Sequence, residues 1–503
     1  MDGGTKSSGW RDWVIKVNEE SIRRRKDDDD NAASAIVKID GAAGGGMTME
    51  EDEQQQEERW KKRCIYRVPA AFAEWNKKAY TPLVVSLGPY HHGEDHLRVM
   101  EGHKHRALVH FLRRSGKPLE RYLHALNPLA QDLKDAYDSL PAGHHQDDDG
   151  GSFLQVMIVD GCFLLEILRT AAISAYYGLG KDNYAPWDPV FSDHGRLYLI
   201  PHLKRDMLVL QNQLPMLLLY TLHAVATNQE YDGDEDGGPS ENDVEFINNL
   251  VVKIWSPDAR DRKFGKCLHV LDLYRKNLLW EPPKYLRKRH QYLNKLRGAQ
   301  RAAQLRRRNT TVATRGGAGE AQIVRSATEL YEAGIRFKRN RTRSLKDISF
   351  RCGVLRMPQI TVDDTSESMF LNQMAFERAH VGAGNEVTAY IFFMDTIIDS
   401  NKDVSLLHNS GVLLNAVGSD KAVAKLFNSL SRDITLDPQS SLDVIQNEVC
   451  EYCKIPWNEW RANLIHTYFR SPWASLSVFA AIFLFALTIV QTIYSILPYY
   501  KPS

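Results

Sequence analysis

The residues best suited to chemistry are histidines gathered near the start of the folded part, in residues 86–93 (SLGPYHHG) and at His96, His103 and His105. Imidazoles serve as metal ligands and as acid–base groups. His92 and His96 stand four apart, a spacing that places both on one face of a helix. Gly93 lies between them, however, and the HExxH pattern is absent. The segment therefore favours a structural turn, and an enzyme site of unrecognised type near His91 and His92 is the alternative.

A second candidate is the pair Cys450 and Cys453, which forms a single CxxC. A zinc site needs a second pair of ligands, and a redox pair usually opens a helix in a βαβ context. Neither feature lies nearby. The pattern predicts ordinary packed thiols, with no metal and no cofactor.

Three carboxylates, Asp160, Glu166 and Asp206, fall in strongly apolar segments. A carboxylate in such surroundings has to be paired or protonated. Arg169 follows Glu166 by three residues, so an ion pair along a helix explains both side chains without catalysis. The chain also lacks a P-loop, a G-x-S-x-G elbow, kinase motifs and a dinucleotide-binding glycine pattern. These observations favour a protein that is not an enzyme.

The composition is that of a folded globular protein, with 43% hydrophobic and 25% charged residues. The formal net charge is +1, so no global field selects nucleic acid as a partner. Six cysteines in 503 residues do not make a disulfide scaffold. The N-terminus has no apolar run of the length of a signal peptide.

The C-terminal region reads as a membrane anchor. Residues 474–497 are dominated by Phe, Leu, Ile, Val and Ala, and about 20 such residues span a hydrocarbon core of roughly 30 Å. Aromatic and aliphatic side chains predicted to hold this helix in the bilayer are Trp473, Phe479, Phe483, Phe485, Ile489 and Tyr494. The pattern predicts a single-pass membrane protein with a tail at 498–503.

Orientation follows from the charges on either side of this span. Arg461 and Arg470 precede it and only Lys501 follows it, which favours a cytosolic body. The predicted location is a membrane, with the plasma membrane as one candidate, and the predicted partners are the lipid bilayer and an unknown protein.

The remainder divides into a disordered N-terminal extension at 1–58 and an α-rich body at 59–470. The extension is rich in glycine and in runs of like charge, which prevent core formation. Helical periodicity marks 93–114, 118–140, 153–174, 203–226, 367–380 and 423–430, with Pro215 predicted to break or restart a helix. Apolar residues alternate with polar ones in 335–338, 345–351 and 353–362, as in short strands. The fold class is therefore α+β, predominantly α-helical with a small β element.

Polar inserts interrupt the body near 141–152, 228–243 and 284–319. The third is rich in Lys and Arg and contains no Asp or Glu. Its Arg306, Arg307 and Arg308 are candidates for lipid or partner contact, because basic clusters bind anionic headgroups. A solvated helical face is the commoner fate of such a run, and a nucleic-acid role conflicts with the predicted anchor.

Several of these segments together resemble a plant protein family, the domain of unknown function 247 (UPF0481-like proteins). The resemblance rests, in order along the chain, on residues 65–69 (IYRVP), 84–93 (VVSLGPYHHG), 157–166 (MIVDGCFLLE), 206–215 (DMLVLQNQLP), 327–337 (ATELYEAGIRF), 372–377 (NQMAFE) and 471–473 (SPW).

The resemblance implies a plant membrane protein with a C-terminal transmembrane helix and no established catalytic residues to carry over. Some grass members of the family are associated with self-incompatibility. The leading hypothesis from the sequence is a membrane-anchored protein, not an enzyme, that acts in protein recognition or signalling. The alternatives are the enzyme near His91 and His92 and an anionic-lipid-binding scaffold.

Overall fold

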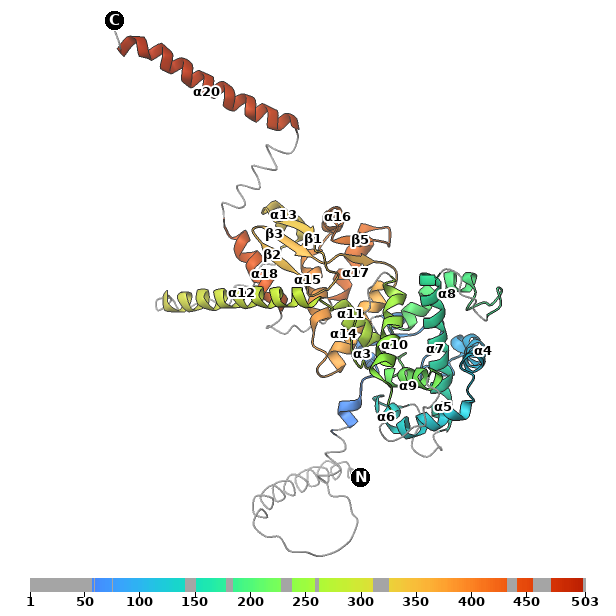
Figure 1. The fold of residues 1–503 in the computed structure, drawn as a ribbon. Coiled ribbons are helices and arrows are strands. Elements are labelled where there is room, and N and C mark those ends of the chain that lie inside the picture. The colour runs from blue at the N-terminus through green and yellow to red at the C-terminus, as the bar shows by residue number, and fades with distance from the viewer. Residues whose placement is uncertain are drawn as a thin grey trace, which may run out of the picture. The chain divides into compact units, whose positions relative to one another are not determined.

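The computed structural model describes residues 57, 59–74, 76–140, 151–177, 184–227, 238–257, 262–310, 325–431, 441–455 and 472–500. The chain divides into two compact units, Met1–Trp60 and Lys61–Ser503. All elements described below belong to the second unit (Figure 1). The extension predicted to be disordered, 1–58, lies almost wholly outside the described residues, as do 141–150, 228–237 and 311–319 of the predicted inserts.

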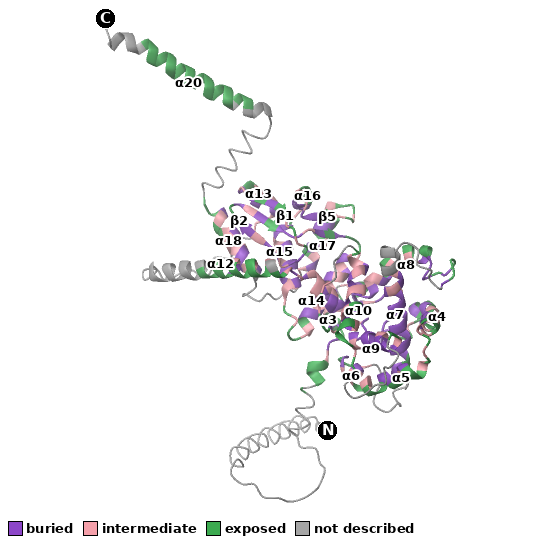
Figure 2. Ribbon diagram, in the orientation of Figure 1, coloured by how far each residue is buried: buried purple, intermediate pink, exposed green. Residues whose placement is uncertain are grey.

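The first hydrophobic core forms around helix α7 (Gly151–Tyr177), which the sequence predicts as a central helix over 153–174. Nearly all described side chains of α7 are buried (Figure 2). The helix packs against α4 (Arg98–Ser115), α9 (Met216–Thr227) and α10 (Glu241–Trp255). Gly161 lets α7 and α9 approach closely, since a Cβ there would lie 2.6 Å from Leu222 Cδ1.

Shorter elements complete this region: α3 (Ala70–Ala73), η2 (Lys77–Tyr80), η3 (Asp95–Leu97), α5 (Leu119–Leu126), η4 (Asn127–Leu129), α6 (Ala130–Asp135), α8 (Asp193–Asp206) and α11 (Val270–Leu278). The helix expected over 118–140 is therefore three short pieces. Helix α9 begins directly after Pro215, as predicted, but residues 207–215 of the helical stretch predicted over 203–226 form turns, because α8 already ends at Asp206. Buried Gln213 holds the intervening turn, since its Nε2 donates to the carbonyls of Met207 and Val209 at 2.7 and 2.8 Å.

The second core lies around the β element. Strands β1 (Arg336–Arg339), β3 (Val354–Met357) and β2 (Ser349–Arg351) form one sheet in that order, with β1 parallel and β2 antiparallel to β3. Strand β4 (Ile360–Val362) pairs in parallel with β5 (Leu413–Asn415). The helices of this region are α12 (Pro283–Thr310), α13 (Ala327–Glu332), α15 (Glu386–Ile397), α16 (Asn401–Asn409), α17 (Asp420–Leu430) and α18 (Ser441–Cys453). The mostly helical α+β body predicted from the sequence is confirmed.

Helix α14 (Ser366–Ala379) joins the two cores. Its Phe376 belongs to the first core, and its Phe370 and Met374 belong to the second. A helix that buries side chains on both sides lacks a clean amphipathic stripe, which is why its bridging role is invisible in the sequence pattern.

The prediction of a C-terminal transmembrane helix is wrong, because no helix among the described residues is long and apolar enough to cross a membrane. Helix α20 (Pro472–Tyr500) does form at the predicted place. Gln491 and the hydroxyls of Thr488 and Thr492 lower the hydropathy of this helix.

Four predictions rested on this span and are corrected with it: the transmembrane fold element, the single-pass membrane location with a cytosolic body, the plasma-membrane assignment, and the lipid bilayer as the partner of the helix. The side chains named as anchors, Phe479, Phe483, Phe485, Ile489 and Tyr494, are exposed on α20, whereas Trp473 lies outside the described side chains. The exposed hydroxyls bond back to the helix, as Thr488 does to the carbonyl of Leu484 at 2.8 Å.

Candidate functional site

Residues 66–74 and 76–80, together called segment 66–80, lie along one side of α14, and the buried side chain of Asn372 holds them there. Asn372 Nδ2 donates to the carbonyl of Ala79 at 2.8 Å, and its Oδ1 accepts from the backbone N–H of Leu210 at 2.8 Å. Ser368, one turn earlier, donates to the same Ala79 carbonyl at 2.6 Å. Three segments distant in the sequence are therefore brought together by one turn of α14.

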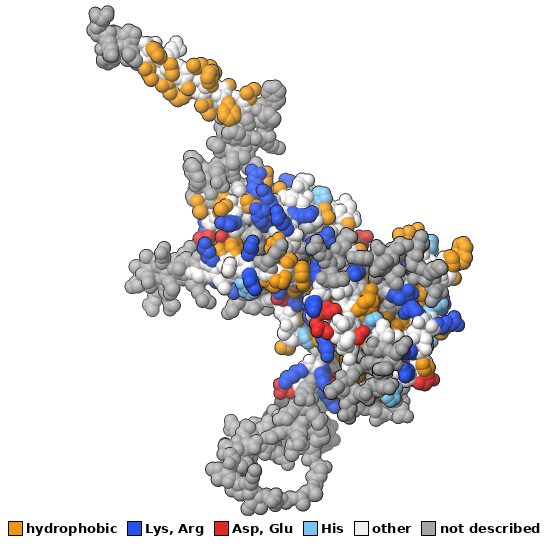
Figure 3. Space-filling view, viewed as in Figure 1, with side chains coloured by type: hydrophobic (Ala, Val, Ile, Leu, Met, Phe, Trp, Pro, Cys, Tyr) orange, Lys and Arg blue, Asp and Glu red, His pale blue; other side chains and the backbone are white. Residues whose placement is uncertain are grey.

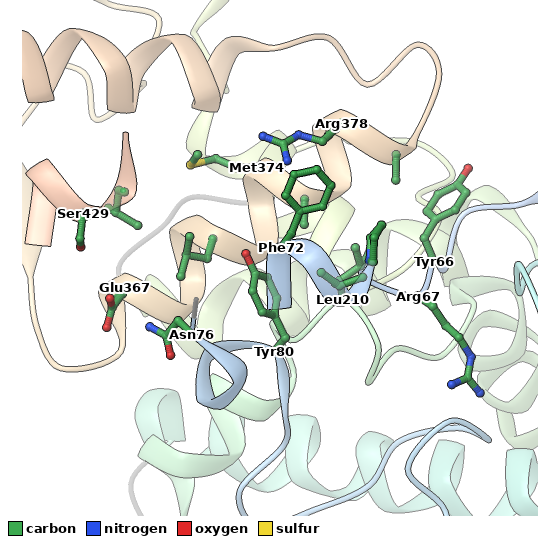
Figure 4. Close-up of a pocket in the computed structure, with 16 residues that line it drawn as sticks. Tyr66, Arg67, Phe72, Asn76, Tyr80, Leu210, Glu367, Met374, Arg378 and Ser429 are labelled. Atoms are coloured by element: carbon green, nitrogen blue, oxygen red, sulfur yellow. The ribbon is translucent and has the colours of Figure 1, made fainter. Parts of the chain in front are cut away.

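A pocket of about 400 Å³ opens where these segments meet the end of α17. This volume suits a small organic molecule or a few apolar side chains of a partner. Most of the lining is apolar, and Figure 4 shows Phe72 and Tyr80 near its centre, below Met374 and Arg378. The lining residues are Tyr66, Arg67, Val68, Pro69, Phe72, Asn76, Tyr80, Leu210, Glu367, Leu371, Met374, Ala375, Arg378, Ala379, Ser429 and Leu430.

A few polar groups stand among these apolar side chains. The guanidinium of Arg378 lies over the ring of Phe72, 4.2 Å from its centroid. Burial raises the pKa of Tyr80, while the charge of Arg378 lowers it and that of Glu367 raises it. Tyr80 is therefore a neutral phenol at physiological pH. The charged side chains of the lining are Arg67, Glu367 and Arg378, and such groups can orient a ligand.

Tyr66 marks the other end of the pocket. Its hydroxyl donates to the carbonyl of Arg63 at 2.8 Å and lies 3.0 Å from His380 Nδ1. Because the phenol has one hydrogen, we assign the second bond to His380, with Nδ1–H as the donor. Burial raises the pKa of Tyr66 to about 12. The phenol of Tyr66 is thus neutral, and two hydrogen bonds hold it at this end of the pocket.

The lining offers groups for noncovalent contact with a ligand. The thiol nearest in sequence, Cys64, is 3% exposed, and burial raises its pKa to about 12, which keeps it protonated. The chemistry available at the lining is apolar contact, hydrogen bonding from hydroxyl and amide groups, and ion pairing with Arg378 or Glu367.

The histidine-rich segment folds as a local turn. His91 is buried, with Nδ1 2.7 Å from Glu94 Oε1, whereas His92 is exposed. His96 Nε2 lies 3.1 Å from the carbonyl of Pro82. Across the described residues, no three His, Cys, Asp or Glu side chains converge as metal ligands would. The enzyme hypothesis for His91 and His92 stays a prediction.

Cys450 and Cys453 lie on the last turn of α18 and remain free thiols. Burial raises the pKa of both cysteines. Raised pKa values disfavour the thiolate that redox or metal chemistry requires.

The apolar-segment carboxylates are paired, as their surroundings require. Asp160 Oδ1 lies 2.7 Å from Lys104 Nζ, and its Oδ2 accepts from the N–H of Gly88 at 2.8 Å. Asp206 accepts from the consecutive N–H groups of residues 83–85 at 2.7–3.1 Å. Both side chains are almost completely buried, so they tie segment 83–88 to the helices and are inaccessible to a substrate.

Glu166 meets Arg169 at 3.1 Å, which agrees with the ion pair inferred from the spacing. It also contacts Arg114 of α4 and accepts from the hydroxyl of Tyr184 at 3.0 Å. The carboxylate therefore joins α4 and α7 to the segment before α8.

Arg306, Arg307 and Arg308 fall within α12, but their side chains lie outside the described set, so their role in lipid or partner contact stays a prediction. The pocket residues were missed by the sequence analysis. Segment 66–80 contains Tyr, Phe and Pro but shows no helical or strand periodicity. The α14 side chains that line the same pocket come almost 300 residues later in the sequence.

The residues that the structure describes form a mostly helical α+β body with an apolar pocket between residues 66–80 and α14. A family described as plant protein of unknown function, DUF247, matches residues 65–487. The chain belongs to this family, as its sequence motifs indicate.

Two curated relatives come from Arabidopsis thaliana. The UPF0481 protein At3g47200 is 31% identical over 445 residues, covering 87% of each chain. The putative UPF0481 protein At3g02645 is 24% identical over 493 residues, covering 85% of this chain and 89% of its own. No solved structure matches the chain.

Proposed function

We propose that this protein is a recognition protein that binds an apolar group in the pocket between segment 66–80 and α14. The observation that carries the proposal is the 400 Å³ cavity lined mainly by apolar side chains. Soluble proteins bury such surface against their own chain unless it serves binding.

The walls of the pocket are pre-organised for this role. Asn372 and Ser368 clamp Ala79 to α14, and Arg378 covers the face of Phe72. A cavity whose walls are already held by hydrogen bonds needs little ordering when a ligand enters, which favours affinity. The apolar group could belong to a small molecule or to a side chain of a protein partner, and both would use the same contacts.

The test fills the pocket with a larger side chain of the protein itself. Ala375 lines the cavity on α14 and is only partly buried, so Ala375→Phe places a ring in the space without displacing a core residue. The matched control, Ala422→Phe, adds the same ring at an exposed position of α17. The probe is 8-anilinonaphthalene-1-sulfonate, whose fluorescence rises in apolar surroundings. Its binding to the exposed apolar side chains of α20 is the same in all three proteins.

We expect Ala375→Phe to remove one saturable class of probe sites, a loss of about tenfold or more in affinity, and Ala422→Phe to retain it. Equal binding by all three proteins would contradict the proposal. Peptides selected from a random display library show whether the apolar group belongs to a protein partner. Peptides that displace the probe from the native protein but not from Ala375→Phe indicate such a partner. If only small organic acids displace it, the ligand is a small molecule.

A further inference from the structure

The outer face of the three-stranded sheet carries side chains of a single charge. Burial alternates along the strands, with Phe337, Phe350 and Leu355 facing the core. The alternate positions face outward, and they hold Arg336 and Lys338 on β1, Ser349 and Arg351 on β2, and Val354 and Arg356 on β3. We call these six residues the basic face. It contains four cations and no carboxylate.

The strand register sets these cations side by side. Lys338 pairs with Arg356 across the parallel β1–β3 ladder, and Arg356 pairs with Ser349 across the antiparallel one. Arg336 and Arg351 both pair with Val354 in the neighbouring row. Like charges directly opposite one another on a sheet are destabilising, so the Lys338–Arg356 pair does not serve folding.

No acidic side chain among the described residues forms an ion pair with these four cations within 4.0 Å. Arg336 donates to the hydroxyl of Tyr331 at 3.1 Å and lies over its ring, 5.0 Å from the centroid. Figure 3 shows Lys and Arg side chains gathered where Figure 1 places α13 and the three strands. By contrast, nearby Lys346 is paired with Glu386 at 2.6 Å.

Protection of sheet edges does not account for this pattern. Charged residues often blunt exposed edges, but Arg356 stands on the central strand, where the backbone is paired on both sides. The outer edge of β2 is also occupied, since the hydroxyl of Tyr292 on α12 contacts both the N–H and the carbonyl of Phe350. The cations therefore act through the face and not through an edge.

We propose that the basic face binds an acidic, carboxylate-rich segment of a protein partner. Alternate residues of an extended chain lie about 7 Å apart, which is also the separation of Arg336 and Lys338 along β1. An extended segment with Asp or Glu at every second position thus matches the face in sign and spacing. Arginine guanidinium groups pair with carboxylates through two parallel hydrogen bonds.

A nucleic-acid strand fits this face less well. Binding of single strands uses exposed aromatic rings on which bases stack. The two aromatic residues of the sheet, Phe337 and Phe350, point into the core, and the outward positions hold none. The chain also has a formal net charge of only +1, so attraction is confined to this patch.

The probe for the test is a fluorescent peptide of about a dozen alternating Glu and Ser residues, titrated into the full-length protein. The face variant carries Arg336→Gln, Lys338→Gln, Arg351→Gln and Arg356→Gln. The control variant removes the same charge from exposed positions elsewhere, with Lys266→Gln, Lys402→Gln, Lys421→Gln and Lys425→Gln. Thermal unfolding of all three proteins shows whether each is folded.

We expect the face variant to bind the peptide about tenfold or more weakly, and the control variant to bind within about twofold of the native protein. Binding should weaken as salt rises from about 50 to about 300 mM, because the contacts are exposed. Equal loss in both variants would overturn the proposal, since net charge alone would then explain binding. A thymidine oligonucleotide that binds more tightly than the peptide, and loses affinity in the face variant, would overturn it in favour of nucleic acid.

If the fourfold variant fails to fold, the single substitution Arg356→Glu tests the proposal in its place. It leaves three cations but places a carboxylate at the centre of the face. We expect it to weaken peptide binding severalfold, and unchanged binding would again overturn the proposal.

Discussion

Charged side chains are used in opposite ways in the two regions of this molecule. In the helical region Lys104 is fully buried, with Nζ 2.7 Å from Asp160 and 2.7 Å from Glu101. On the β-sheet, Arg356 and Lys338 are exposed, adjacent and without a described carboxylate partner. A buried charge must be neutralised by its own chain, whereas an exposed one remains available to another molecule. The difference separates charges that hold the fold from charges that can recognise a partner.

The largest expected effect comes from breaking the buried pair. Asp160→Ala leaves buried Lys104 with Glu101 and the hydroxyl of Ser86, and it also removes the acceptor of the Gly88 N–H. We expect a loss of about 3–5 kcal/mol in the free energy of unfolding, measured by urea denaturation. The matched control is Asp95→Ala, which removes an exposed partner of Arg98 and should change stability by less than about 1 kcal/mol. Equal losses of stability in Asp160→Ala and Asp95→Ala would show that a buried ion pair contributes no more to stability than an exposed one.

A second test concerns pH. Burial lowers the pKa of His269 to about 4, and its neutral ring accepts from the N–H of Asp272 at 3.1 Å and meets the carbonyl of Cys64 at 3.0 Å. The unfolded histidine, with a pKa near 6.5, binds a proton first on acidification. Stability contributed by the neutral ring is therefore present above about pH 6.5 and is lost as pH falls toward 4, by up to about 3 kcal/mol.

The measurement is the melting temperature of native protein, His269→Gln and His92→Gln between these pH values. His92 is exposed and serves as the histidine control. We expect the decline in melting temperature on acidification to become shallower in His269→Gln only. An unchanged decline would mean that other groups account for acid sensitivity.

Asn372 links the two regions and should show an intermediate effect. Asn372→Leu preserves the size of the side chain but leaves the Leu210 N–H without its acceptor and Ala79 without one donor. We expect a loss of about 2 kcal/mol in unfolding free energy together with weaker probe binding in the pocket. Asn401→Leu, at an exposed position on α16, should change neither. A loss of stability with intact probe binding would separate the clamp from the pocket.

The smallest change in unfolding free energy is expected on the basic face. Whether stability rises or falls there is the informative result. Arg356→Gln removes repulsion from Lys338, so we expect stability to stay constant or rise by less than about 1 kcal/mol. Arg341→Gln, an exposed position beyond the strand, is the control. Clear destabilisation in Arg356→Gln would show that the arginine supports the fold, so that exposed charges of the sheet would not differ from buried ones in this respect.

Prediction from sequence succeeded where the residues of a single segment indicate its secondary structure. Apolar density placed α7, Pro215 marked the start of α9, and alternation located the short strands. The helix at the C-terminus was also placed correctly, but its capacity to span a membrane was overestimated.

By itself, the sequence determined the family, the mainly helical α+β class and the need to pair Asp160, Glu166 and Asp206, because these follow from local composition, motifs and burial of charge. Only the tertiary structure decided which partners those carboxylates meet. It also decided that segment 66–80 meets α14 to form a pocket, and that four cations share one face of a sheet. Such contacts join residues tens to hundreds of positions apart, and local patterns carry no information about which distant segments will pack together.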